Sequence, residues 1–172
     1  WNGIYGESLV PGNFLTLSPC GKYTEYQQWN INSGKTISLT NFDDSCIICS
    51  NEGYCNWGFI PTISNDCSSN NYMLNWNINY GNDNTVTISG PNNLCIQSIG
   101  ANDYGMILTM QCNLQYNNNI YQEFVLDTTN KYIKSNVNDS LCLTAYYYPR
   151  NNCSQSPFNT YDYCDMNLPI NT

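Results

Sequence analysis

The chain repeats itself three times with a period of about 47 residues, and this repeat is the feature that most limits what it can fold into. Three-residue units end in an aromatic residue at Trp29, Trp76 and Phe124, which are 47 and 48 positions apart. Two sets of cysteines and one set of β-type runs follow the same spacing. They are Cys20, Cys67 and Cys112 (47 and 45 apart), Cys46, Cys95 and Cys142 (49 and 47 apart), and the runs beginning at Thr36, Thr85 and Tyr132 (49 and 47 apart). Four landmarks with one period predict three copies of one supersecondary unit.

Each period contains four short runs that are typical of β-strands. The runs are continuously apolar or alternate between apolar and polar residues, and Gly, Asn and Asp separate them. No stretch has the 3.6-residue periodicity of an amphipathic helix, so we expect an all-β domain. Asn occurs 30 times and Tyr 15 times, which favours short strands joined by polar loops. Twelve such strands that close on one another would also remove the exposed edges of an open sheet.

Three segments of the chain resemble a known family. They are Leu15-Thr16-Leu17-Ser18-Pro19-Cys20, Gln27-Gln28-Trp29 and Thr36-Ile37-Ser38, and they resemble the repeat of the ricin B-type (R-type) lectins with its Gln-x-Trp signature. Residues 131–136 and 141–144 resemble the end of that repeat and the start of the next. The resemblance spans roughly residues 12–145 and implies a β-trefoil with three four-stranded repeats. We therefore expect the trefoil at residues 1–145, with a disulfide-pinned C-terminal extension packed on it at residues 146–172.

The resemblance also implies how the ten cysteines pair. In the family, a Cys on the first strand of a repeat commonly pairs with one on the second strand. Cys142 opens a first strand whose second strand is the segment ending at Cys20, so a bridge between them would close the trefoil; Cys164 is the alternative partner of Cys142. The expected bridges are Cys46–Cys67 and Cys95–Cys112 by the family rule, Cys20–Cys142 by closure, and Cys49–Cys55 and Cys153–Cys164 as the remaining local pairs.

The even number of cysteines indicates a disulfide framework that formed in an oxidising compartment. The chain begins at Trp1 without an initiator Met, which is typical of a mature or excised piece, so we expect an extracellular location, secreted or at the cell surface. The Cys46–Cys49 spacing also fits a zinc or redox C-x-x-C motif. It lies in a predicted strand, however, and the sequence has neither a second C-x-x-C nor a His. We therefore expect structural disulfides and no metal site.

The charge balance argues against several classes of protein. Lys and Arg total 5 against 13 Asp and Glu, a net charge of −8, so nucleic acid and anionic lipid would repel the surface. No apolar run approaches the roughly 18 residues of a membrane helix. Because the sequence has no His, most catalytic mechanisms that use a Ser–His or Cys–His nucleophile are excluded. The carboxylate pairs Asp43/Asp44 and Asp162/Asp165 would fit a glycosidase or a calcium site, but they lie among turn-forming Asn residues. We expect no enzyme, no cofactor, no nucleic-acid partner and no direct membrane insertion.

R-type lectins bind sugar through three kinds of position in a repeat, and this sequence departs from the family at all of them. The positions are an Asp two residues after the first-strand Cys, a stacking aromatic two residues before the second-strand Cys, and an Asn before the Gln-x-Trp unit. Their replacements here are Ile48, Gln97 and Thr144; Ser18, Asn65 and Met110; and Tyr26, Met73 and Tyr121.

The third unit departs least from the family. Gln97 still offers an amide, and Asn102, Asp103 and Tyr104 in the following loop offer an amide, a carboxylate and a ring, which are the groups that bind sugar hydroxyls and C–H faces. We expect these four as ligand-binding residues; the other interpretation is an ordinary Asn-Asp turn with a surface Tyr. Gln122 we expect to be buried, with hydrogen bonds to the backbone.

The resemblance implies a carbohydrate-recognition or adhesion domain for galactose-type or N-acetylgalactosamine-type glycans. The Asn, Tyr and Cys content is also similar to that of the amoebic galactose/N-acetylgalactosamine-inhibitable lectins. The altered sugar positions favour the alternative, a protein-binding or architectural β-trefoil that holds other adhesin subunits. A third hypothesis, a trefoil-type hydrolase inhibitor, needs a protruding loop such as residues 49–59 or 145–160. The tyrosines of residues 146–172 either pack against the barrel or form a contact surface.

Overall fold

The computed structural model describes residues 14–49, 54–67, 71–81, 84–103, 105–112 and 120–145. These residues form an all-β fold, as predicted, with short 3₁₀ turns and no α-helix. The strands are β1 (Leu15–Pro19), β2 (Trp29–Ile31), β3 (Ile37–Leu39), β4 (Phe42–Ile48), β5 (Thr62–Ser64), β6 (Asn77–Tyr80), β7 (Thr85–Ser89), β8 (Leu94–Ile99), β9 (Gly105–Gln111), β10 (Glu123–Asp127), β11 (Tyr132–Ser135) and β12 (Leu141–Ala145). The 3₁₀ turns are η1 (Thr24–Tyr26), η2 (Tyr72–Leu74), η3 (Pro91–Asn93) and η4 (Ile120–Gln122). Within the described ranges, none of the helices is long and apolar enough to cross a membrane.

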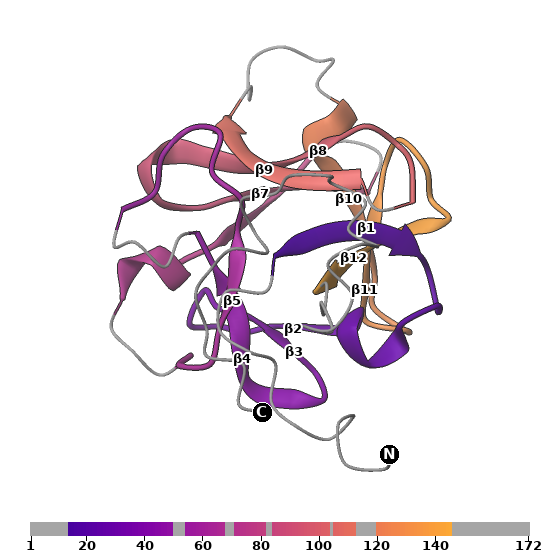
Figure 1. Ribbon diagram of the computed structural model, residues 1–172, viewed down its shortest axis with the longest axis horizontal. Coiled ribbons are helices and arrows are strands. Elements are labelled where there is room, and N and C mark those ends of the chain that lie inside the picture. Colours follow the sequence, from indigo (N-terminus) through magenta and orange to yellow (C-terminus); the bar gives the residue numbers. More distant parts are fainter. Residues whose placement is uncertain are drawn as a thin grey trace, which may run out of the picture.

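The strands form two antiparallel sheets (Figure 1). The larger has the order β10-β11-β12-β1-β9-β8-β7-β6, and because β10 also pairs with β7, this sheet curls back on itself. The smaller has the order β2-β3-β4-β5. β1 and β12 lie side by side although they stand at opposite ends of the described chain, with Leu15 opposite Ala145. The paired ends leave no free edge on either strand, since β1 pairs with β9 and β12 with β11 on their other sides.

Three kinds of strand pairing each occur three times. A Cys-bearing strand pairs with the strand that follows it in β4·β5, β8·β9 and β12·β1. The strands that follow the aromatic units pair in β2·β3, β6·β7 and β10·β11. The connections between these pairs are β3·β4, β7·β8 and β11·β12.

Four disulfides link the described residues, and three of them join a Cys-bearing strand to the end of its partner strand. They are Cys20–Cys142, Cys46–Cys67, Cys49–Cys55 and Cys95–Cys112, which are four of the five pairings expected from the sequence. Cys142 therefore pairs with Cys20 and not with Cys164. The bridge joins residues 122 positions apart, and in the chain-entropy model a loop of that size contributes on the order of 5 kcal/mol to stability. The expected Cys153–Cys164 bridge and the extension at residues 146–172 lie outside the described residues.

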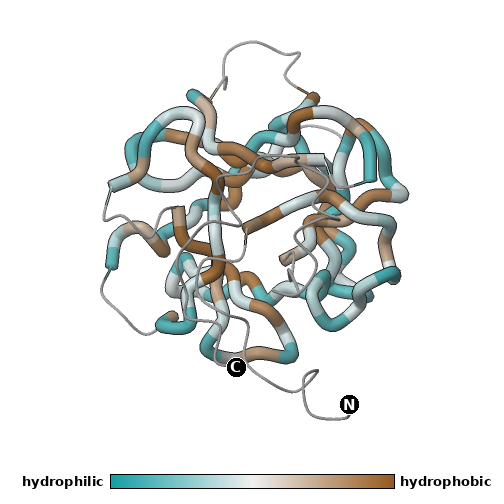
Figure 2. The backbone as a smooth tube through the Cα atoms, in the orientation of Figure 1, coloured by the Kyte–Doolittle hydropathy of each residue, from teal (hydrophilic) through white to brown (hydrophobic). Residues whose placement is uncertain are grey.

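The periodic aromatic residues lie in the core. Trp29, Trp76 and Phe124 are at most 3 % exposed, and hydrophobic segments follow the strands through the middle of the molecule, while hydrophilic segments lie in the peripheral loops (Figure 2). The two indoles make matching hydrogen bonds, because Trp29 Nε1 donates to the Leu143 carbonyl and Trp76 Nε1 to the Ile47 carbonyl, each at 2.9 Å. A buried indole N–H needs such a partner, so the core fixes each Trp against the residue after a periodic Cys.

Candidate functional site

The position that carries Asp in the R-type family is buried in the unit that joins the two ends of the described chain. Thr144 occupies it, and its Oγ1 accepts a hydrogen bond from Gln27 Nε2 at 3.0 Å and donates to the Cys142 carbonyl at 2.9 Å. Gln27 is itself fully buried, donating to the Pro19 carbonyl and accepting from the Gly21 amide at 2.8 Å. Both side chains are therefore engaged inside the protein and are not presented to a ligand.

The same relation holds in the third unit, where Gln122 contacts Gln97. Gln122 Nε2 donates to Gln97 Oε1 and to the Gln111 carbonyl, each at 2.9 Å. Gln122 is 2 % exposed, so the prediction that it is buried and bonded to backbone is confirmed. The amide oxygen of Gln97, a predicted ligand group, is used by Gln122.

In the remaining unit the corresponding residues are apolar. Leu74 stands where Gln27 and Gln122 stand in the other units, Ile48 stands where Thr144 and Gln97 stand, and both are buried in the hydrophobic core. The residues at these two positions thus match in polarity in each unit. At this family position, all three units have packing or internal hydrogen bonding in place of an exposed carboxylate.

The other two sugar positions of the third unit are occupied by Met110 and Tyr121. Met110 is half-buried on β9, opposite Cys95 on β8. Tyr121 is 39 % exposed, its neighbour Ile120 43 % and Ile99 52 %. η4 packs on β8, and Ser98 Oγ donates to the Tyr121 carbonyl at 3.3 Å. The Met110 thioether is only a weak acceptor, and neither residue offers the amide or carboxylate that the family has at these positions.

The predicted loop residues lie at the turn between β8 and β9. Asn102 and Asp103 are adjacent and exposed, and Asp103 forms an exposed ion pair of 3.1 Å with Lys22 Nζ. Tyr104 lies outside the described residues. Gln97 belongs to the strand ladder, with its oxygen bonded to Gln122. Of the four predicted ligand residues, the structure thus places Asn102 and Asp103 together in the turn and Gln97 apart from them on β8.

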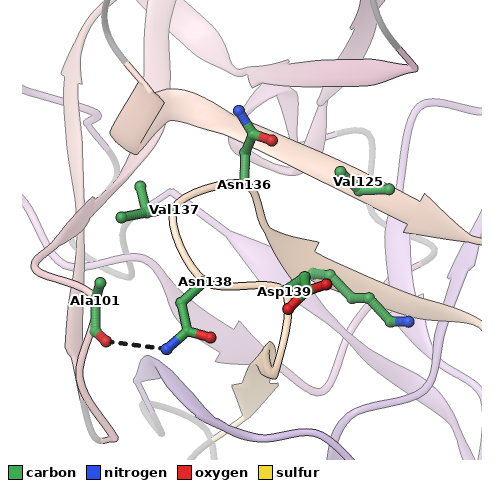
Figure 3. A pocket seen from close by; sticks show the side chains of 7 residues that line it. Ala101, Val125, Asn136, Val137, Asn138 and Asp139 are labelled. Carbon is green, nitrogen blue, oxygen red and sulfur yellow. Dashed lines mark hydrogen bonds between the residues drawn. The ribbon is translucent and has the colours of Figure 1, made fainter.

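A pocket of about 640 Å³ opens beside this turn (Figure 3). One wall is the connection between β11 and β12, residues 136–139, and the facing wall contains Ala101 of the β8–β9 turn. Val125 of β10 and Lys134 of β11 complete it. The pocket therefore lies against the predicted loop but is built mainly from residues about 35 positions further along the chain.

The polar groups of the pocket differ in how far they are already engaged. Asn138 Nδ2 donates to the Ala101 carbonyl at 3.4 Å, the contact drawn in Figure 3, and its Oδ1 accepts from the Ser140 amide and hydroxyl. Asn138 therefore ties the two walls together. Asn136 Nδ2 donates to Glu123 Oε2 at 2.8 Å. Asn136 Oδ1 and the exposed Asp139 carboxylate have no hydrogen-bond partner within the described residues, so these acceptors face the solvent.

Lys134, the cation among the described residues of the pocket, is paired with a neighbouring carboxylate. Lys134 Nζ lies 2.9 Å from Asp127 Oδ2. Hydrogen bonds from the Asn130 side chain and from Lys134 hold the pKa of Asp127 well below its usual range. Asp127 is therefore ionised at neutral pH beside Lys134.

Residues Asn136, Asn138 and Asp139 were missed as candidates in the sequence. The only local signal was a glycosylation sequon, Asn138-Asp139-Ser140, which a chain this rich in Asn and Ser contains by chance. Their approach to Ala101 follows from the pairing of β12 with β1 and of β1 with β9, and no local pattern contains that information.

No three His, Cys, Asp or Glu side chains come together in the described part of the chain to hold a metal ion. The carboxylates Asp162 and Asp165 lie outside that part, and the expectation of no enzyme and no cofactor stays a prediction. No model of a known protein family matches the sequence, and no curated protein matches it.

Proposed function

We propose that the chain is a β-trefoil of the R-type lectin kind, with three four-stranded repeats. The three kinds of strand pairing, each occurring three times, support this. So do the links between units: the Trp29 amide donates to the Lys131 carbonyl at 2.8 Å and the Trp76 amide to the Lys35 carbonyl at 2.7 Å. Both lysines precede a strand in the left-handed conformation, with φ of 59° and 65°.

The proposed function is recognition of a neutral glycan in an extracellular adhesin, through the pocket at residues 136–139. The observation that carries it is the combination of groups there: free amide and carboxylate acceptors beside the aliphatic side chains of Val125 and Val137. Sugar hydroxyls are bound by planar acceptors, and the C–H faces of the ring by apolar surface. The volume lies within the roughly 300–1,000 Å³ typical of small-molecule sites.

The net charge limits the class of glycan that we propose, and the cysteines limit the proposed location of the protein. The net charge of −8 and the free carboxylate of Asp139 disfavour sialylated or sulfated glycans, so the ligand class is a neutral hexose or N-acetylhexosamine, galactose-type by the family resemblance. The four disulfides are typical of a chain that works outside the cell.

A glycan array followed by titration calorimetry tests this proposal. We expect the wild-type chain to bind neutral galactose-type glycans, and Asp139→Ala to lose most of that binding. Asp44→Ala is the matched control, since Asp44 is an exposed Asp on β4 away from the pocket. Asp103→Ala separates the pocket from the neighbouring turn. A flat array, or equal binding by Asp139→Ala and wild type, contradicts the proposed site.

A second candidate function is binding of another adhesin subunit, favoured by the adjacent exposed side chains of Ile120 and Tyr121 on η4. Exposed aromatic and aliphatic groups at one place are typical of protein contacts. A flat array, together with subunit binding that Tyr121→Ser weakens, would support this function over the first.

A further inference from the structure

The turn at residues 56–59, in one of the protruding loops noted in the sequence, is held by a single buried residue. Thr109 of β9 is fully buried, and its amide donates to the Phe59 carbonyl at 2.7 Å while its carbonyl accepts from the Gly58 amide at 2.6 Å. Its Oγ1 contacts the Asn56 carbonyl at 2.7 Å and the Phe59 carbonyl at 3.1 Å. Both backbone groups and the hydroxyl of one residue therefore fix this turn.

The chain leading into the turn is fixed as well. Cys55 is buried and forms a disulfide with Cys49, and its carbonyl accepts a hydrogen bond from Asn92 Nδ2 at 2.8 Å. The rings of Tyr54 and Phe59 lie 5.4 Å apart in a tilted contact. Covalent, polar and aromatic contacts thus restrict the segment, and little conformational entropy remains to be lost when it binds a ligand.

This rigid turn presents an indole to solvent. Trp57 is 65 % exposed, whereas Trp29 is 3 % and Trp76 2 % exposed. Burial of so large an apolar side chain would be favourable. The contacts that fix the backbone on both sides of Trp57 nevertheless keep the indole exposed to solvent. The indole of Trp57 does not contribute to the core, although contacts with the core fix the loop that carries it. An exposed Trp on a fixed loop indicates a binding role.

Asparagine residues lie next to the segment that carries the indole. Asn56 precedes it, and the hydrogen bond from Asn92 to Cys55 brings η3 against the segment. Asn92 and Asn93 are exposed and both adopt the left-handed conformation, with φ of 59° and 57°. The side-chain amides of Asn56 and Asn93 make no hydrogen bond within the described residues. Consecutive left-handed residues other than Gly are strained, and such strain concentrates at ligand sites.

We propose that Trp57 is the stacking platform of a second saccharide site, which takes one neutral pyranose ring. The indole face packs on the C–H face of the ring, and the amides of Asn56 and Asn93 bind its hydroxyl groups. No residue is shared with the pocket at residues 136–139, so this site goes beyond the proposed function and does not depend on it. The acidic chain disfavours anionic sugars here too.

Acrylamide quenching of tryptophan fluorescence tests this site in the full chain carrying Trp1→Phe. In that background Trp57 is the only Trp that is not buried, because Trp29 and Trp76 lie in the core. The probes are galactose, N-acetylgalactosamine, glucose and mannose, with sorbitol as the open-chain control. We expect at least one pyranose, and not sorbitol, to protect the fluorescence from quenching.

Calorimetry with Trp57→Ala measures the affinity. We expect the sugar to bind about tenfold more weakly, because the stacking contact is lost, and Trp57→Phe to retain part of the affinity. Tyr80→Ala is the matched control, since Tyr80 is an exposed aromatic residue, 79 % accessible, on β6.

The outcomes distinguish this site from the pocket. Protection that persists in Asp139→Ala supports the Trp57 site whatever happens to the pocket. Calorimetric binding that Asp139→Ala removes and Trp57→Ala leaves unchanged overturns the inference and leaves the proposed function standing. If no pyranose protects the fluorescence, the inference is wrong.

Discussion

Replacing Gln27 by Leu tests whether the buried amide stabilises the fold or only fills space. Leu has nearly the volume of Gln, and Leu74 occupies the corresponding position of another unit, where it is 1 % exposed. The substitution therefore removes hydrogen bonds and introduces a residue that the corresponding position of another unit already contains. Because the two side chains have similar volumes, a loss of stability would come mainly from the lost hydrogen bonds and not from a steric clash or a cavity.

The expected cost follows from the groups left unpaired. The Gly21 amide loses its acceptor at 2.8 Å, and the Pro19 carbonyl and Thr144 hydroxyl lose their donor at 3.0 Å. Thr144 keeps its bond to the Cys142 carbonyl, and Gly21 is exposed enough to be hydrated. The Pro19 carbonyl and the Ser18 carbonyl, which accepts from the same Nε2 at 3.4 Å, are therefore the two groups that bear the cost of roughly 1–3 kcal/mol each. Burial of the Leu side chain in place of the amide stabilises the fold by about 1 kcal/mol. We expect a net loss of about 2–3 kcal/mol.

Guanidinium unfolding with the disulfides intact, followed by far-UV circular dichroism, measures this free energy of unfolding. For a chain of this length the loss corresponds to a fall in Tm of about 4–10 °C. Gln122→Leu is the companion variant, and it should also destabilise because it leaves Gln97 Oε1 and the Gln111 carbonyl without their donor. An unchanged or raised midpoint in Gln27→Leu, at equal m-value, would refute the reasoning that the polar pairs hold the units together.

Two further predictions concern stability. Gly90→Ala places a Cβ 2.6 Å and 2.8 Å from ring carbons of the buried Trp76, so we expect a loss of about 1–3 kcal/mol in chemical unfolding; Gly34→Ala, whose Cβ meets nothing within 4 Å, is the control and should be near neutral. Asp127→Asn should be less stable than wild type at neutral pH, because the lowered pKa of Asp127 stabilises the fold while the group is ionised. The difference in the free energy of unfolding should shrink as the pH falls below about 4, where the carboxyl of the unfolded chain takes up its proton. Unfolding curves between pH 7 and pH 2 measure this difference. A difference that stays constant over that range would show that the carboxylate does not stabilise the fold.

The periodic residues made the framework predictable from the sequence. Cys20 and Cys142 are at opposite ends of the repeat, and the requirement that the last unit find a second strand predicted their bridge, which the structure contains. Trp29 and Trp76 lie on the period and are buried, whereas Trp57 lies off the period and is exposed. The departure of Trp57 from the period is therefore a signal for its exposure that the sequence contains.

The candidate sites were less predictable for physical reasons. The amide of Gln97 has the same donors and acceptors whether it faces a sugar or Gln122, and only the three-dimensional register of β8 against η4 decides between them. The pocket is similar, because Ala101 and residues 136–139 meet only through two successive strand pairings. Side-chain chemistry can be read along the chain, but the partner of each group depends on contacts between distant segments.

The matched pairs at the family's Asp position explain why the proposed binding groups lie in loops. Each pair, whether Gln27 with Thr144, Gln122 with Gln97 or the apolar Leu74 and Ile48, satisfies itself inside the protein. A single exchange within a pair leaves a buried polar group without its partner, which costs stability, so these strand positions resist conversion to an exposed ligand group. Loops carry no such constraint. Asn138 and Thr109 each fix a loop from its base, so the exposed residues Asp139 and Trp57 can be substituted without a change in the framework.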